Sequence, residues 1–114
     1  MSFQQTELQT ELKQLARKFS DNEIWPTIEN DEHDERFRPE LIKKMGDLGL
    51  TGIPVPEAYS GSGLGYLDYI GVIEEIARAS VSYEVSVAVT GLPQIILNQF
   101  GTEKKKKKYI APLA

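Results

Sequence analysis

The first apolar residues of the chain recur at the spacing of an amphipathic helix. The stripe consists of four large side chains that lie four, three and four positions apart: Leu8, Leu12, Leu15 and Phe19. This spacing puts them on one face of a helix. Thr6 and Gln9 stand in the arrangement of a capping box, in which two side chains satisfy N–H groups of the first turn. Pro26 removes a backbone donor and clashes with the turn before it, so the helix is predicted to kink or end near Trp25.

Two more helices are predicted between residues 39 and 79. Pro39 suits the first helical position, where its missing N–H costs nothing, and Gly49 is a natural C-terminal stop. The apolar face of this second helix is formed by Leu41, Ile42, Met45 and Leu48. The third helix has its apolar face at Tyr69, Val72, Ile73, Ile76 and Ala77. Between the two helices, the prolines of 53–56 and the glycines of 60–65 predict a loop.

The stretch from Ser82 to Phe100 carries conflicting signals. Its first apolar positions alternate with small or polar ones, which is a strand signature: Tyr83, Val85, Val87 and Val89. Two features argue against a strand: the run is too long for one, and Pro93 is unfavourable in a central strand. Ser82 is also a suitable helix N-cap. The pattern alone favours a helix and a strand nearly equally. We expect a helix from Ser82 to Asn98, because burial by neighbouring helices overrides the weak preference of valine for strands.

The end of the chain completes an all-α pattern. Thr102 is placed to cap a last helix that runs through the lysines to Ile110, and Pro112 ends it. We therefore expect about five helices in a compact orthogonal or up-down bundle that forms one domain over residues 1–114.

Composition narrows the class of protein. With 13 basic and 17 acidic residues the chain has a formal net charge of −4 at pH 7, whereas nucleic-acid binders carry a net basic face. It has no cysteine, which excludes disulfides and thiolate metal sites. No apolar run reaches the roughly 20 residues of a membrane span, and the first residues do not resemble a secretory signal. We expect no nucleic-acid partner and a reducing intracellular compartment such as the cytoplasm.

Three motifs could carry chemistry, and in each the ordinary structural interpretation is favoured. The glycines of 61–65 could cradle a phosphate, but phosphate-binding loops follow a strand, and 53–56 makes a poor one. The five lysines of 104–108 could bind an anionic partner, although charge runs usually mark an exposed helix. The acidic run 31–35 contains the single histidine, His33, and it lacks the ligands of a zinc site and the glycine of a calcium loop. We expect a flexible acidic turn there, and we assign no catalytic or metal-binding residue.

Three stretches together resemble the opening of acyl-CoA dehydrogenases. They are Leu41–Leu50 with Gly52–Glu57, then Tyr59–Gly65 with Glu74–Arg78, and finally Phe100–Glu103 followed by lysines and Tyr109–Leu113. Each stretch alone is weak, whereas their order and spacing are specific, and the resemblance extends from about Leu8 to Ala114. The chain departs from the usual family sequence at two local turns. The family usually has Gly-Gly where this chain has Ser60-Gly61, and Phe-Pro where it has Phe37-Arg38.

The resemblance implies a helical N-terminal domain that, in the family, precedes a β-domain and a second helical domain; both are absent from this chain. Together the three domains bind FAD and oxidise an acyl-CoA thioester to the trans-2-enoyl-CoA. A glutamate removes the α-proton while the β-hydrogen leaves as hydride to the flavin. That glutamate and many flavin contacts usually lie in the C-terminal domain. We therefore expect the 114-residue chain alone to bind no FAD and to be inactive.

In the family the N-terminal domain forms one wall of the acyl pocket, largely from the helix that matches 82–100. In a helix, Glu84, Ala88, Gly91 and Leu92 fall near one face, and these four are the candidate substrate-binding residues. Small residues at 88 and 91 would leave room for an acyl tail, but ordinary helix packing uses small residues as well. Because this helix is apolar on most sides, we also expect it to expose an apolar patch beside Ala88 and Gly91 when the later domains are absent.

The resemblance also implies partners: the acyl-CoA substrate, the remaining domains of the enzyme, an electron-transfer flavoprotein and, at full length, further copies in a homo-oligomer. Two other classes of protein stay open. The chain could be a non-catalytic helical interaction module that docks an electron-transfer flavoprotein or another protein. It could also be a stand-alone acyl- or CoA-binding protein, which is less favoured because no phosphate-specific cluster is visible.

Overall fold

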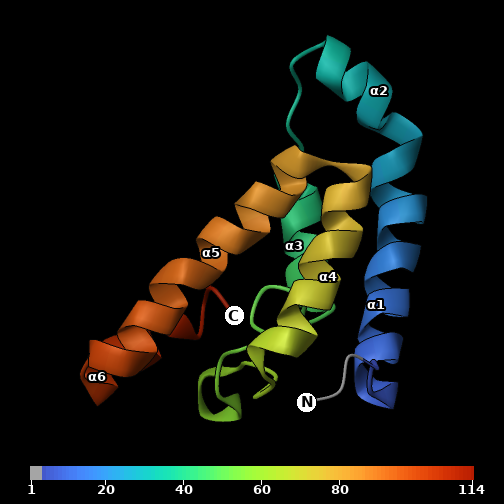
Figure 1. Ribbon diagram of the computed structural model, residues 1–114. Helices are drawn as coiled ribbons and strands as arrows, with labels where there is room; N and C mark the ends of the chain where they lie inside the picture. Colours follow the sequence, from blue (N-terminus) through green and yellow to red (C-terminus); the bar gives the residue numbers. More distant parts are fainter. Residues whose placement is uncertain (1–3) are drawn as a thin grey trace.

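The computed structural model describes residues 4–114 and confirms the all-α prediction (Figure 1). The longer α-helices are α1 (Glu7–Phe19), α2 (Trp25–His33), α3 (Pro39–Asp47), α4 (Tyr66–Ala79) and α5 (Val81–Phe100). A short α6 (Glu103–Lys105) continues into a π-helical turn, Lys106–Ile110. There are two further helical turns: a π-helical turn at Ser20–Ile24 and a 3₁₀ turn at Glu57–Tyr59. Within residues 4–114 no segment forms a β-strand.

Helix α4 lies at the centre of the arrangement, packed against α1 on one side and α5 on the other, with α3 behind α4 and α5 (Figure 1). Helices α1, α3, α4 and α5 each give one apolar face to the core between them, which buries Phe19, Met45, Ile76 and Val87. A smaller cluster of Val55, Tyr59 and Ile110 attaches the C-terminal turn to the loop before α4. None of the helices in the described part of the chain has the length and apolarity needed to cross a bilayer.

The first helix begins as its sequence predicts, but it ends at Phe19, before the kink or stop predicted near Trp25. The Gln9 N–H donates to Thr6 Oγ1 at 3.1 Å, and the Thr6 N–H donates to Gln9 Oε1 at 3.0 Å, which confirms the capping box. After Phe19 the chain makes the wider π-helical turn, and the Trp25 N–H donates to the Ser20 carbonyl. Pro26 then falls in the first turn of α2, where a missing N–H is tolerated.

The acidic run is not the flexible turn that the sequence predicts. Helix α2 includes its first three residues and ends at His33, so only Asp34 and Glu35 form a turn, and Asp31 is buried. The carboxylate of Asp31 accepts two hydrogen bonds from the guanidinium of Arg38, one from Nε at 2.6 Å and one from Nη2 at 2.9 Å. This bidentate ion pair neutralises the buried charge. The prediction was wrong because it treated the whole run as solvated, whereas one of its carboxylates has a cationic partner seven residues away.

Asp31→Asn is expected to lower the stability of the chain at neutral pH but not in acid. The hydrogen bonds from Arg38 hold the pKa of the Asp31 carboxyl below its ordinary value, against the opposing effect of burial. A carboxyl with a lowered pKa in the folded state stabilises the fold above its unfolded pKa of about 4. That contribution is lost as the pH falls through the folded-state pKa. Urea unfolding of wild type and variant should therefore differ at neutral pH and converge in acid.

Asp47→Asn is the matched control for this pair, because Asp47 pairs with Lys43 on the exposed face of α3. Exposed i,i+4 pairs contribute little, so this variant should track the wild type at every pH. A gap between wild type and Asp31→Asn that stays constant into acid would contradict the role given to the carboxylate.

Arg38 also explains one departure from the family pattern. Its backbone N–H donates to the Tyr83 hydroxyl at 3.0 Å, and the Phe37 ring stacks on the Tyr83 ring with centroids 5.0 Å apart. A proline at position 38 has no N–H and could not make this bond. The α2–α3 connection is therefore tied to the first turn of α5, the helix that carries the candidate substrate-binding residues.

The segment from Ser82 to Asn98 is helical, as predicted, despite its strand-like alternation. Residues two positions apart lie on nearly opposite sides of a helix, so Val87 is buried while Val85 and Val89 are 47% and 60% exposed. The predicted cap is wrong by two residues: Ser80, not Ser82, is the N-cap, and its hydroxyl accepts the Tyr83 N–H at 3.4 Å. Ser82 lies inside the first turn of α5.

Candidate functional site

The four candidate residues occupy one side of α5, where it borders α4. Gly91 is buried, Glu84 and Ala88 are half-buried, and Leu92 is 57% exposed. The structure therefore brings them together on one helix but at different depths. Only Ala88 and Leu92 present apolar atoms toward the surface.

Gly91 is small because another part of the same domain needs the space. A Cβ at this position would lie 2.9 Å from the hydroxyl oxygen of Tyr69, which reaches across from α4. The Tyr69 hydroxyl donates to the Val87 carbonyl in a long bond of 3.4 Å. Helix packing, one of the two explanations open for Gly91 from the sequence, thus accounts for it.

Tyr69 is a member of this site that the sequence did not single out. Burial, and secondarily the negative charge of Glu84, raise the pKa of the Tyr69 hydroxyl above its ordinary value. The group therefore stays neutral at physiological pH and serves as a hydrogen-bond donor. In the sequence Tyr69 is one of several apolar positions of the third helix, and no local signal pairs it with Gly91, 22 positions later.

The predicted apolar patch is present on the surface of α5. Its large side chains are all at least 47% exposed: Val81, Val85, Val89, Leu92 and Ile96. On α4, Leu67 and Ile70 are 76% and 58% exposed. Figure 1 shows the two helices meeting at the short connection between Ala79 and Val81 and diverging toward their other ends. We refer to the five α5 side chains as the α5 stripe.

The glycine loop before α4 is structural, in agreement with the favoured interpretation. The N–H groups of residues 61–64 donate to carbonyls of 52–56 at 2.8–3.1 Å, and the Gly65 N–H donates to Asp68 Oδ2 at 3.0 Å. A phosphate cradle requires backbone N–H groups that point away from the chain toward the anion. All five are engaged internally, so this loop has no donor left for a phosphate.

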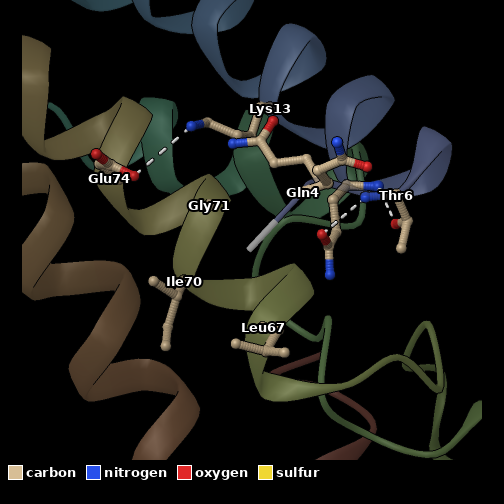
Figure 2. A pocket seen from close by; sticks show the side chains of 9 residues that line it. Gln4, Thr6, Lys13, Leu67, Ile70, Gly71 and Glu74 are labelled. Atoms are coloured by element: carbon tan, nitrogen blue, oxygen red, sulfur yellow. Dashed lines mark hydrogen bonds and ion pairs between the residues drawn. The ribbon is translucent and has the colours of Figure 1, made fainter. Parts of the chain in front are cut away.

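A hollow of about 380 Å³ lies between the start of α1 and the outer side of α4 (Figure 2). Polar side chains of the α1 end face Leu67 and Ile70, and the Lys13 ammonium reaches the Glu74 carboxylate at 3.6 Å. None of the four candidate residues lines it. Among residues 4–114, no group of three or more histidine or acidic side chains is placed to hold a metal ion.

Comparison with known proteins gives a consistent result along the whole chain. Residues 6–114 match the sequence model of the family described as "Acyl-CoA dehydrogenase, N-terminal domain". The chain is 37% identical over 115 residues to the short-chain specific acyl-CoA dehydrogenase of Clostridium acetobutylicum. That match covers 100% of this chain and 30% of the Clostridium enzyme.

Solved structures match as well. Butyryl-CoA dehydrogenase from Megasphaera elsdenii has the same fold with a TM-score of 0.94 at 33% identity, over 99% of this chain and 30% of that one. An acyl-CoA dehydrogenase from Bacillus anthracis, complexed with FAD, matches with a TM-score of 0.78 at 32% identity, over 96% of this chain and 19% of that one. The chain spans less than a third of the length of these relatives.

Proposed function

Because the chain belongs to the acyl-CoA dehydrogenase N-terminal domain family, we propose that it is the N-terminal domain of a flavin-dependent acyl-CoA dehydrogenase. Such an enzyme converts an acyl-CoA thioester to the trans-2-enoyl-CoA. In this proposal the chain supplies one wall of the acyl pocket, from the side of α5 that carries Glu84, Ala88 and Leu92. The remaining domains supply the catalytic base and most of the flavin contacts, and an electron-transfer flavoprotein accepts the electrons.

The exposed α5 stripe, in a domain whose whole length matches the family, carries this proposal. Large apolar side chains left in water cost free energy in proportion to their exposed area, and contiguous patches of this kind mark binding surfaces. Ala88 lies next to the stripe and has the smallest side chain of the three residues proposed for the wall of the acyl pocket. Once another domain covers the stripe, the space beside Ala88 is where an acyl tail would fit, with Leu92 as its apolar neighbour.

In this proposal the residues of the chain do not form an FAD site by themselves. Its candidate phosphate donors, the N–H groups of 61–65, all bond within the chain. When bound by the complete enzyme, FAD would accept the hydride from the substrate. The part proposed for this chain is limited to binding and orienting the acyl tail and to excluding water from it through the α5 stripe. No proton or hydride transfer is assigned to its residues.

The test is an activity assay of the complete gene product that carries this chain, reconstituted with FAD, against acyl-CoA substrates of increasing chain length. We expect dehydrogenation with wild-type protein. Ala88→Leu fills the space beside α5, so it should lower kcat/KM for the longer substrates by about tenfold or more while sparing the shortest, since a methylene in an apolar pocket is worth that much. Ala58→Leu, at an exposed position in the turn before α4, is the matched control.

Two outcomes would count against the proposal in different ways. A flavin-containing product with no dehydrogenase activity on any acyl-CoA would refute the reaction. An active enzyme in which Ala88→Leu and Ala58→Leu have the same chain-length profile would keep the reaction and refute the acyl-pocket role of α5.

The second candidate is a non-catalytic interaction module, and the α5 stripe also favours it, because an apolar helix face fits a protein partner as well as a neighbouring domain. One observation distinguishes the two candidates. A module would bind electron-transfer flavoprotein, or another protein, as the 114-residue chain and would need no further domain. A dehydrogenase domain would require the rest of its polypeptide before activity appears.

A further inference from the structure

The strongest concentration of charge in the molecule lies at its C-terminal corner. Five consecutive lysines, 104–108, occupy α6 and the π-helical turn that follows, accompanied by a single acidic residue, Glu103. They stand out because the chain as a whole has a net charge of −4. Nothing in the proposed acyl-pocket role uses them, and the inference below does not depend on that role.

One of the five lysines has a structural task. The Lys106 ammonium lies 5.7 Å from the centroid of the Tyr59 ring and 3.8 Å from Glu103 Oε1. The Tyr59 hydroxyl in turn donates to the Glu103 carboxylate at 2.8 Å. Together with buried Ile110, Lys106 therefore faces the body of the domain and fixes the orientation of the whole segment.

The other four lysines lie at the surface. All four are exposed, and within the described residues none of them forms an ion pair: Lys104, Lys105, Lys107 and Lys108. Of the four lysines elsewhere in the sequence, Lys13, Lys43 and Lys44 each pair with a carboxylate. Like charges three and four positions apart repel one another on a helix. We call these four residues the lysine cluster.

The position of the lysine cluster suits contact with an extended surface. Figure 1 shows α6 at the free end of α5, at an outer corner of the molecule on the side away from α1. The exposed ring of Phe100, 81% accessible, ends α5 just before the cluster, and Tyr109, 48% accessible, follows it. A corner that combines cations with exposed aromatic rings can approach a flat partner without a clash from the rest of the domain.

The chemistry of the cluster favours a diffuse anionic surface over a single anionic ligand. Lysine ammonium groups are hydrated point charges on flexible stems, whereas arginine provides the rigid fork that recognises one carboxylate or phosphate. The cluster contains no arginine. Clusters of four or more basic residues attract anionic lipid headgroups, and aromatic rings settle at the lipid–water interface. We infer that the lysine cluster, with Phe100 and Tyr109, is a peripheral docking surface for an anionic membrane.

The test is co-sedimentation of the complete gene product with vesicles, either of phosphatidylcholine alone or of phosphatidylcholine and phosphatidylglycerol in equal parts. We expect binding to the anionic vesicles only, and we expect added salt to weaken it, because exposed charges are screened within about 8 Å at physiological ionic strength. Replacing all four lysines of the cluster with glutamine should lower the partition coefficient by about a hundredfold or more, since each lysine near such a surface contributes about a fivefold factor.

A second quadruple variant, with glutamine at Arg17, Lys18, Lys43 and Lys44, is the matched control. It removes the same number of positive charges from exposed positions on α1 and α3, and its binding should stay within about twofold of wild type. Both variants should keep the wild-type far-ultraviolet circular dichroism, because all the replaced side chains are exposed.

Three results would overturn the inference. Equal binding to neutral and anionic vesicles would show that the binding is not electrostatic. Equal losses of binding in the two quadruple variants would show that the lysine cluster has no specific role. Lysine-dependent binding to immobilised polyglutamate or to inorganic polyphosphate, without binding to anionic vesicles, would assign the cluster to an acidic protein or a free polyanion instead of a membrane.

Discussion

Gly61→Ala is expected to destabilise the domain by about 3 kcal/mol, a large part of the stability of an ordinary small domain. An added Cβ would lie 2.1 Å from the carbonyl oxygen of Val55 and 2.5 Å from its carbonyl carbon. Both are backbone atoms of a buried residue, and the oxygen also accepts a hydrogen bond from the Gly63 N–H. They therefore cannot move aside without breaking the loop. The effect is purely one of space, because Gly61 does not have a positive φ. Urea unfolding of the 114-residue chain measures it.

Ser60→Gly is the control in the adjacent position, and its effect should have the opposite sign. Ser60 has φ 71° and ψ 16°, the left-handed conformation that favours glycine. Glycine there should stabilise the chain by about 0.5–1 kcal/mol, because it relieves the contact between Cβ and the backbone. If Gly61→Ala changed the unfolding free energy by less than Ser60→Gly, the close approach of Gly61 to Val55 would not be a real constraint. If both predictions hold, glycine is required at position 61, the second of the glycine pair usual in the family, and is only preferred at position 60.

Ala88→Asp is expected to have opposite effects on the isolated chain and on the complete enzyme. In the 114-residue chain the α5 stripe is exposed, and we expect it to cause self-association; a carboxylate in its middle should make the chain monomeric at concentrations where wild type associates. In the complete enzyme the same carboxylate would be buried against the acyl tail without a partner. It should lower kcat/KM by about a hundredfold or more, since an unpaired buried charge costs several kcal/mol.

Ala58→Asp supplies the control for both measurements, because it adds the same charge at an exposed position outside α4 and α5. It should leave activity unchanged and self-association close to that of wild type. Analytical ultracentrifugation of the isolated chain and steady-state kinetics of the complete enzyme give the two readouts. A wild-type chain that stays monomeric at high concentration and unfolds cooperatively would show that the α5 stripe needs no cover, which would favour the interaction module.

The sequence alone was sufficient for several features whose determining contacts lie within one helical turn. The capping box at Thr6, the break before Pro26, the start of α3 at Pro39 and the positive φ of Gly49 all follow from residues at most four positions apart. Local sterics and local hydrogen bonds decide these features, so the residue types are enough. The succession of such helical signals along the chain predicted the all-α class, and the order of the family motifs then indicated the family, because it constrains the chain along nearly its whole length.

The sequence was insufficient wherever a residue's partner is distant in the chain. The bond from the Arg38 N–H to Tyr83 joins positions 45 residues apart, and it ties the α2–α3 connection to the first turn of α5. The burial of Asp31 and the fit of Tyr69 against Gly91 likewise depend on how helices cross, which periodicity does not encode. The pattern showed that α5 is apolar on most sides, but only the packing of α4 against it decided that Val87 is buried and Val85 and Val89 are exposed. A helical pattern specifies which side chains share a face, and the free energy of tertiary packing selects the face that is covered.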